Sequence, residues 1–213
     1  MKKGIFITIE GPEGGGKSTQ ARLLCERLRE KGMSVVHTRE PGGTKVAEAI
    51  RHILLTPDFH VHPITELLLY EASRAQHTFN VILPALKNGK SVVSERYTDA
   101  TLAYQGYGRG LDLKIIGSLN NVATGGLKSD MTVYLDISSA AGLLKAKKKN
   151  DFANGDRIEN ESLKFHKKVR QGYLKLAKRH PGRIKVVKVK DTIEATHKDI
   201  LKLVEKRLCL KKS

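Results

Sequence analysis

The segment EGPEGGGKSTQ, Glu10–Gln20, directly follows the short apolar run IFITI at Ile5–Ile9. From Gly11–Ser18 it matches the pattern G-x-x-x-x-G-K-[ST] without a mismatch. Glycines let such a loop curl so that its backbone N–H groups point inward at phosphate oxygens. The lysine of the pattern reaches the outer phosphates, and the hydroxyl that follows it can meet Mg²⁺. The segment is therefore interpreted as a nucleotide-binding P-loop.

The flanking sequence supports this interpretation. The apolar run is typical of a buried parallel strand, and STQARLLCERLREKG has apolar residues at helical spacing, with Gly32 as a plausible C-terminal cap. The positive end of that helix would lie at the phosphates. The residues expected to bind ATP are Gly11, Pro12, Glu13, Gly14, Gly15, Gly16, Lys17, Ser18 and Thr19.

The chain is strongly basic, with 39 Lys and Arg against 22 Asp and Glu and a formal net charge of +17. Residues 1–120 carry 16 basic and 12 acidic side chains, whereas residues 121–213 carry 23 and 10. A nucleic-acid surface is one interpretation of the basic C-terminal part. Because aromatic residues that could stack on bases are not interleaved with the lysines, a solvated lysine-rich face is favoured and nucleic-acid binding is not expected.

Length and cysteine content argue for a single-domain protein without a membrane span or disulfides. The 213 residues suit one domain with a substantial core. The sequence contains no run of 18 apolar residues, so no membrane span is expected. Cys25 and Cys209 are isolated in the sequence, which indicates a reduced, cytoplasmic protein without structural disulfides or zinc.

Apolar strands alternate with helical segments along the chain. Strands are expected at Ile5–Ile9, Val35–Thr38, Ser91–Ser94, Thr132–Asp136 and Ile184–Val189. Helices are expected near 17–31, 44–55, 64–88, 112–123, 139–149, 159–180 and 192–208. This alternation predicts an α/β protein, a P-loop NTPase fold with a five-stranded parallel sheet and helices on both faces.

The chemically distinctive segments come just after predicted strands, where ligands of such sheets bind. TREPGGT follows the second strand and SERYTDATLAYQGYGRG follows the third. Their arginines would form a second anion site beside the P-loop, as expected when the phosphoryl acceptor is itself a phosphate. A GTPase would usually show an Asn-Lys-x-Asp signature, which is absent, and the protein-kinase patterns are also absent.

These segments together resemble the bacterial thymidylate kinase (dTMP kinase) family along nearly the whole chain. The resemblance is carried by EGPEGGGKST, TREPGGT, LLLYEASRAQH, ERYTDATLAYQGYGRG, MTVYLD and DRIENE. It implies a single nucleoside monophosphate kinase-like domain over residues 1–213, with a lid near 145–157, and a homodimer. It further implies ATP-dependent, direct in-line phosphorylation of dTMP to dTDP for dTTP biosynthesis, with Mg²⁺ bound beside ATP.

The resemblance also assigns expected roles to the acceptor site. Tyr70 would stack on thymine, and Arg74 would donate to a base carbonyl. Gln105 would read the base edge, Thr101 would lie against the base, and Tyr104 would crowd the sugar 2′ position. Arg39 and Arg96 would hold the monophosphate, with Arg51 as a further candidate and with Glu13 and Glu40 fixing sugar, phosphate or metal-bound water. The full dTMP-binding set is Arg39, Glu40, Arg51, Tyr70, Arg74, Arg96, Tyr97, Thr101, Tyr104 and Gln105.

The expected catalytic and metal residues depart from the family pattern in three places. The catalytic set is Lys17, Glu95, Arg96, Lys147, Lys149 and Arg157, and the metal would meet Ser18 and Glu95. Glu95 stands where Asp is common, which could shift the metal geometry. Lys145, Lys147, Lys148 and Lys149 stand where lid arginines are common, and lysine lacks the bidentate fork. Arg157 is the candidate lid arginine, with pairing to Asp156 or Glu159 as its alternative, and Ala100 replaces a frequent serine.

Three other functions compete with a dTMP kinase. A nucleoside monophosphate kinase for another base would use the same chemistry. A P-loop ATPase stimulated by nucleic acid would use the basic C-terminal part and depend steeply on salt. A protein that binds ATP and dTMP but transfers little phosphate would be explained by the lysine-rich lid.

Overall fold

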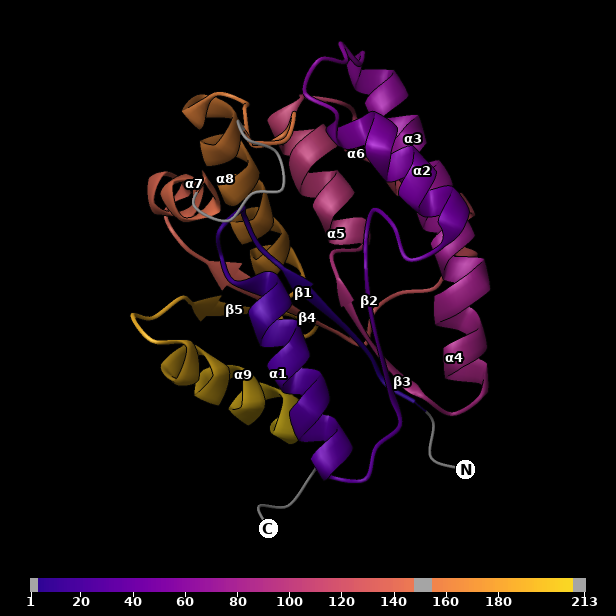
Figure 1. Cartoon of the computed structure of the whole chain (residues 1–213), viewed down its shortest axis with the longest axis vertical. Coiled ribbons are helices and arrows are strands. Elements are labelled where there is room, and N and C mark those ends of the chain that lie inside the picture. Colours follow the sequence, from indigo (N-terminus) through magenta and orange to yellow (C-terminus); the bar gives the residue numbers. More distant parts are fainter. Residues whose placement is uncertain (1–3, 148–154, 209–213) are drawn as a thin grey trace.

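The computed structural model describes residues 4–147 and 155–208 of the chain (Figure 1). Within them, one sheet has the strand order β2-β3-β1-β4-β5, and every neighbouring pair is parallel. The strands are β1 (Phe6–Glu10), β2 (Val35–Arg39), β3 (Ser91–Glu95), β4 (Met131–Asp136) and β5 (Ile184–Lys188). The predicted fold class is therefore confirmed, and each of the five strand predictions is correct to within one residue at either end.

Helices cover both faces of this sheet (Figure 1). Helix α1 packs against α9 on one face, whereas α8 packs against β4 and β5, and α4 against β3. The helices are α1 (Lys17–Glu30), α2 (Lys45–Leu55), α3 (Pro63–His77), η1 (Thr78–Ile82), α4 (Leu83–Lys87), α5 (Thr98–Thr101), η2 (Leu102–Gly108), α6 (Leu113–Thr124), α7 (Ser139–Lys147), α8 (Leu163–Arg179) and α9 (Ile193–Leu208).

The alternation of side chains along β1 divides the core. Ile7 and Ile9 point into a cluster with apolar residues of α1 and α9. Phe6 points to the other face, where it meets Tyr97 edge to face at 4.9 Å. Successive strand residues face opposite sides, so Glu10 also points away from α1, and its carboxylate meets Tyr173 of α8.

Two helical predictions need correction. The long helix expected near 64–88 is interrupted by the π-helical turn η1, and α8 begins at Leu163 rather than near 159 because the Ser162 side chain caps it by accepting from the backbone N–H of Phe165. The segment before it is a turn in which the Asp156 carboxylate accepts from two backbone N–H groups.

The helical segments α5 and η2, which follow β3, are not among the helices expected from the sequence. Glycine and aromatic residues in LAYQGYG are poor helix formers, but packing on α8 stabilises this segment. A Cβ on Gly108 would lie 2.7 Å from the Phe165 ring, and a Cβ on Gly172 would lie 2.6 Å from the Tyr107 ring. Close contact between these two helices therefore requires the two glycines.

The remaining expectations concern membranes and disulfides. No helix among the described residues is both long and apolar enough to cross a bilayer. Cys25 is buried on α1 and is not in a disulfide, and Cys209 lies outside the described residues.

Candidate active site

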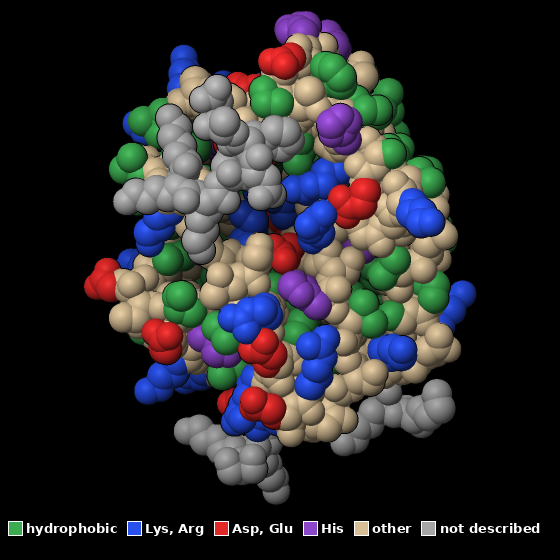
Figure 2. All heavy atoms as spheres, in the orientation of Figure 1, with side chains coloured by type: hydrophobic (Ala, Val, Ile, Leu, Met, Phe, Trp, Pro, Cys, Tyr) green, Lys and Arg blue, Asp and Glu red, His purple; other side chains and the backbone are tan. Residues whose placement is uncertain are grey.

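The carboxyl ends of β1, β2 and β3 meet at one edge of the sheet, and a cavity of about 280 Å³ lies there. Figure 2 shows Lys and Arg side chains gathered in the hollow at the middle of this face. The cavity is lined by Glu13, Gly14, Lys17, Ser18, Arg39, Glu40, Pro41, Arg51, Leu55, Tyr70, Arg74, Glu95, Arg96, Ala100, Thr101, Tyr104, Gln105, Asp156, Ile158 and Glu159. The predicted donor and acceptor residues thus converge on one space.

The P-loop joins β1 to α1. Gly11, Gly14 and Gly16 have positive φ angles of 152°, 66° and 85°, which side chains disfavour. Lys17 Nζ donates to the carbonyl of Pro12 at 2.9 Å. Burial and the nearby Arg96 guanidinium lower the pKa of Lys17 to about 8. The ammonium is therefore held at the loop, where burial and the Arg96 charge outweigh the nearby carboxylates Glu13 and Glu95.

The P-loop also touches α7 through backbone atoms. A Cβ on Gly14 would overlap the carbonyl of Gly142, and a Cβ on Gly142 would overlap the carbonyl of Glu13. Both positions therefore exclude any side chain. Of the predicted ATP-binding set, four residues reach the cavity wall, and the other five, Gly11, Pro12, Gly15, Gly16 and Thr19, complete the loop and the start of α1.

Ser18 and Glu95 lie side by side below the loop. Ser18 Oγ donates to Glu95 Oε2 at 2.5 Å, and His37 Nε2 lies 3.1 Å from Glu95 Oε1. Burial opposes ionisation of Glu95, but the hydrogen bonds from His37 and Ser18 outweigh it and lower the carboxyl pKa. A hydroxyl beside an ionised carboxylate is an oxygen donor set that suits Mg²⁺.

Arg96 begins the segment after β3 with a φ of 67°, unusual for a residue with a side chain. Its N–H donates to Ile9, and its carbonyl accepts from Ser94 Oγ at 2.9 Å. The guanidinium donates to Glu13 Oε1 at 2.7 Å and lies 4.8 Å from the centre of the Tyr104 ring. These contacts hold Arg96 against the P-loop, on the wall of the cavity.

Glu13 is the counterion of Arg96. Tyr104 Oη also donates to its Oε1 at 2.7 Å, and His166 Nδ1 lies 3.5 Å from its Oε2. Burial opposes ionisation, but Arg96 and the His166 contact hold the pKa of Glu13 well below its usual range. The Arg96 guanidinium and the Glu13 carboxylate therefore form an ion pair on the cavity wall.

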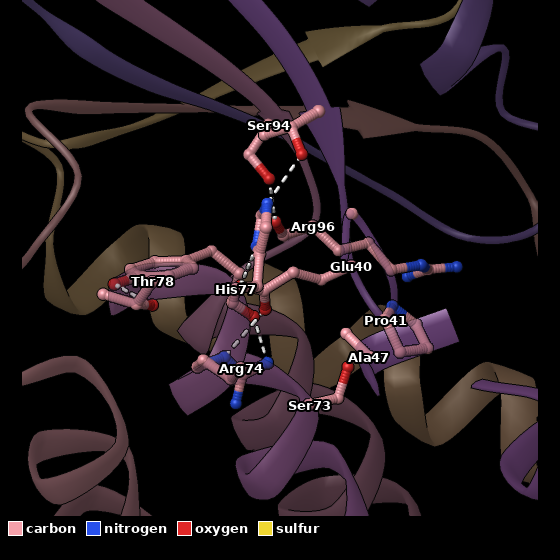
Figure 3. A network of polar contacts seen from close by, with 12 residues as sticks. Glu40, Pro41, Ala47, Ser73, Arg74, His77, Thr78, Ser94 and Arg96 are labelled. Carbon is pink, nitrogen blue, oxygen red and sulfur yellow. Dashed lines mark hydrogen bonds and ion pairs between the residues drawn. The ribbon is translucent and has the colours of Figure 1, made fainter. Parts of the chain in front are cut away.

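Arg74 of α3 is almost fully buried, with 2% of its side chain exposed. Figure 3 shows Glu40 between Arg74 and His77, with bonds to both at 2.8 and 3.0 Å. The other partners of the Arg74 guanidinium are Glu71, Thr101, Asn120 and the carbonyl of Tyr97. Every guanidinium nitrogen has an acceptor, so the orientation of this side chain is fixed before any ligand binds.

The two remaining predicted phosphate-binding arginines differ in their partners. Arg39 is half exposed and pairs with Glu48 at 3.0 Å. Arg51 donates to the carbonyl of Pro41 at 3.0 Å. An exposed pair of this kind contributes little stability, so Arg39 can exchange Glu48 for a ligand at small cost.

Outside the P-loop, two predicted site residues, Tyr97 and Arg157, lie apart from the cavity wall. The Tyr97 side chain is in the core beside Phe6, and its backbone carbonyl accepts from Arg74. Arg157 pairs with the buried carboxylate of Glu66 at 2.7 Å rather than with Asp156 or Glu159. Lys149 lies outside the described residues, as does Lys148, and the structure describes no side-chain placement for Lys147.

Sequence reasoning missed the partners that hold the site residues. They are the buried residues Glu10, Glu66, Glu71, His77, Asn120, His166 and Tyr173, and the partly exposed Arg109. Glu66 and Glu71 could have been noticed as charged residues on the helical face that carries Tyr70 and Arg74. The others lie far along the chain from their partners, and spacing gives no signal for them.

The fold and the phosphate loop define a P-loop NTPase. A family model described as thymidylate kinase matches residues 9–200. The thymidylate kinase of Syntrophotalea carbinolica is 52% identical over 194 residues, covering 89% of this chain and 90% of that protein. That of Synechococcus sp. (strain JA-2-3B'a(2-13)) is 48% identical over 206 residues, covering 97% of each. A crystal structure of thymidylate kinase from Ehrlichia chaffeensis superposes with a TM-score of 0.78 at 33% identity, covering 96% of this chain and 100% of that one. The chain belongs to the thymidylate kinase family.

Proposed function

We propose that this protein transfers the γ-phosphoryl group of ATP to dTMP, giving ADP and dTDP. The observation that carries the proposal is the shared cavity, where the P-loop residues Lys17 and Ser18 meet an arginine pair and an aromatic side chain suited to a nucleoside monophosphate. An enzyme whose acceptor is water would not need the second group of cations.

On the donor side, the P-loop amides and Lys17 would hold the ATP phosphates. Ser18 and Glu95 would hold Mg²⁺ together with phosphate oxygens and water. No cluster of three or more His, Cys, Asp or Glu side chains in the described ranges is arranged to bind a metal alone, which suits an ion that arrives with the nucleotide. Bound there, Mg²⁺ would neutralise charge on the transferring phosphoryl group.

On the acceptor side, Arg96 and Arg39 would clamp the monophosphate, with Arg51 behind them. Tyr70 would stack on the base, and Arg74 would donate to a base carbonyl. Tyr104, held by Glu13, would crowd the sugar 2′ position. A phosphate monoester oxygen is already an anion near neutral pH, so no general base is required. Catalysis would then consist of in-line positioning and charge stabilisation.

The lid assignment is a separate part of the proposal. We propose one domain over residues 1–213, with a lid near 145–157 that closes on the donor. Lys145, Lys147, Lys148 and Lys149 would supply its charge. Arg157 could join them only after leaving Glu66, to which it is paired in this structure. That requirement, and the absence of a bidentate fork on lysine, would slow transfer relative to an arginine lid.

The test is an ADP-release assay with ATP and Mg²⁺, run with and without dTMP, and with dTDP identified by chromatography. We expect ADP release to depend on dTMP and to match dTDP formation. Release without dTMP, stimulated by DNA or RNA, would instead indicate an ATPase. Binding of both nucleotides without dTDP would indicate a lid too weak for transfer. Phosphorylation of dGMP or UMP in preference to dTMP would identify a kinase for another base.

We also propose a homodimer. Large apolar side chains are exposed on neighbouring helices α2, α3, η1 and α6, and Figure 2 shows hydrophobic side chains along the α2 and α3 side. They are Val46, Ile53, Ile64, Leu68, Phe79, Ile115 and Val122, none of which lines the cavity. A second copy would cover this face, and sedimentation of the purified chain measures its mass. A cytoplasmic location stays a prediction.

A further inference from the structure

The Glu66 side chain of α3 is fully buried, yet it is a charged group. Its two carboxylate oxygens are surrounded by donors. Oε1 accepts from Arg109 Nε at 3.1 Å and from Gln105 Nε2 at 2.7 Å. Oε2 accepts from Arg109 Nη2 at 2.9 Å and lies 2.7 Å from Arg157 Nη1. Four donors therefore occupy all the lone-pair directions that a carboxylate offers.

This environment keeps Glu66 ionised. Burial alone would raise the carboxyl pKa, but the hydrogen bonds from Arg109 and Gln105 outweigh it, and the pKa lies below its usual value. An ionised carboxylate accepts hydrogen bonds and cannot donate one. Whatever faces Glu66 must therefore be a donor.

Because Glu66 accepts only donors, it determines how the side-chain amide of Gln105 is oriented. Its amide has a donor end and an acceptor end, and the residue is buried at the wall of the cavity. With the NH₂ group bound to Glu66, the carbonyl oxygen must turn away from that carboxylate. The flipped amide would place two buried oxygens against each other without a proton between them, which is costly.

We propose that Glu66 is a positioning residue for base selection. It locks the Gln105 amide so that the carbonyl oxygen faces the cavity and accepts a hydrogen bond from a base with N–H at ring position 3. This inference rests on the proposed function and sharpens it, because thymine and uracil carry that N–H whereas cytosine has a bare acceptor nitrogen there. The Glu66–Gln105 pair therefore rejects cytosine bases at ring nitrogen 3. Arg74 cannot make this distinction, because a guanidinium has only donors and cannot accept a hydrogen bond from the N–H of thymine.

The experiment compares two ligands of nearly the same shape: dTMP, and 5-methyl-2′-deoxycytidine monophosphate, which has an amino group at position 4 and no hydrogen on N3. Dissociation constants of both are measured by calorimetry on the full chain, together with dTDP formation by the unmodified protein. The quantity compared is selectivity, the ratio of the two dissociation constants. A purely structural defect would weaken both ligands together and leave the ratio unchanged.

Three variants and one control separate the contribution of the Gln105 amide to selectivity from that of the Glu66 carboxylate. Gln105→Met removes the amide at similar volume, and Glu66→Gln can donate to Gln105 and so permits the flipped orientation. Glu66→Asp keeps the charge for both arginines but withdraws the carboxylate from Gln105. Glu161→Gln removes the other carboxylate partner of Arg109, at 2.5 Å, and leaves the Gln105 contact intact.

We expect selectivity for dTMP to fall about tenfold in Gln105→Met and in Glu66→Gln, the effect of one mispaired buried hydrogen bond. A smaller fall in the same direction is expected in Glu66→Asp, and no change in the control. If Glu66→Gln does not fold, Glu66→Asp decides for that residue. Unchanged selectivity in Gln105→Met, or in the folded Glu66 variants, overturns the proposal. An unmodified protein that makes dTDP while the variants keep its selectivity refutes only this inference, whereas one that binds neither ligand refutes the proposed function.

Discussion

Glu10 provides a stability test that can be worked out from the structure. Its carboxylate is fully buried at the end of β1, where it accepts from the N–H of Tyr97 and from Tyr173 Oη, each at 2.7 Å. Within residues 4–147 and 155–208, no Lys, Arg or His side chain forms an ion pair with it. Burial, reinforced by the negative charge of Asp99, raises the pKa of Glu10 from 4.5 to about 7. The group therefore prefers to be neutral in the folded protein.

The sign of the pH effect follows from this shift. Below pH 4.5 the carboxyl is protonated in both the folded and the unfolded chain. Between pH 4.5 and about 7 the unfolded chain releases the proton and the folded chain keeps it, so this group makes folding less favourable as pH rises. Above about 7 both states are ionised and the penalty stays constant. A raised pKa of this size corresponds to about 3 kcal/mol of unfolding free energy.

The perturbation is Glu10→Gln, which keeps the shape and cannot ionise. Urea unfolding of variant and unmodified protein is followed by circular dichroism at about pH 5 and about pH 8. We expect the variant to gain roughly 2–3 kcal/mol relative to the unmodified protein between the two conditions. Glu26→Gln, which removes an exposed pair with Arg22, is the control and should change by under about 0.5 kcal/mol at either pH. The reasoning is refuted if the Glu10→Gln difference is the same at both pH values or shifts against the variant.

Three further predictions concern ligands. Tyr70→Ala should weaken dTMP binding at least about tenfold through lost stacking while leaving ATP binding unchanged; equal dTMP affinity by calorimetry would exclude stacking. ATP affinity should fall as pH rises through about 8, because Lys17 is a cation below its pKa and loses its charge above it; Lys17→Met should bind ATP weakly and lack this step, and a flat profile for the unmodified protein would contradict the assignment. Arg39→Met should raise the KM for dTMP about tenfold yet change the unfolding free energy by under about 1 kcal/mol, because its pair with Glu48 is half exposed; a large loss of stability with normal KM would show a structural role instead.

The sheet could be predicted because its strands are short apolar runs with distinctive segments after them. The cavity could be predicted only with the help of the family resemblance. Helical spacing alone would make Tyr70 an ordinary core residue, and yet it lines the cavity. Tyr97 shows the opposite error, since it follows Arg96 directly in sequence but points into the core, because successive residues leaving a strand face different ways.

What could not be predicted is the pairing of buried charges. Glu66 meets Arg109, which is 43 positions further along the chain, and Glu10 meets Tyr173 across 163 positions. Such partners are brought together by the tertiary fold, and local propensity carries no information about them. The helical turn at Leu102–Gly108 was missed for the same reason, because contacts with α8 stabilise it against its composition.

The backbone contact between Gly14 and Gly142 has a mechanical consequence. At neither residue is there room for a single additional carbon atom between the P-loop and α7. The backbones of the loop and the helix are therefore in direct contact, with no gap into which either could move. We expect a displacement of the loop to displace α7 as well, because close-packed contacts transmit strain. The segment proposed as the lid begins within the last turn of α7 (Ser139–Lys147), so we expect the position of this helix to depend on the position of the P-loop. A methyl group at Gly142 would overlap the carbonyl of Glu13, so Gly142→Ala should push the P-loop away from α7 and weaken ATP binding.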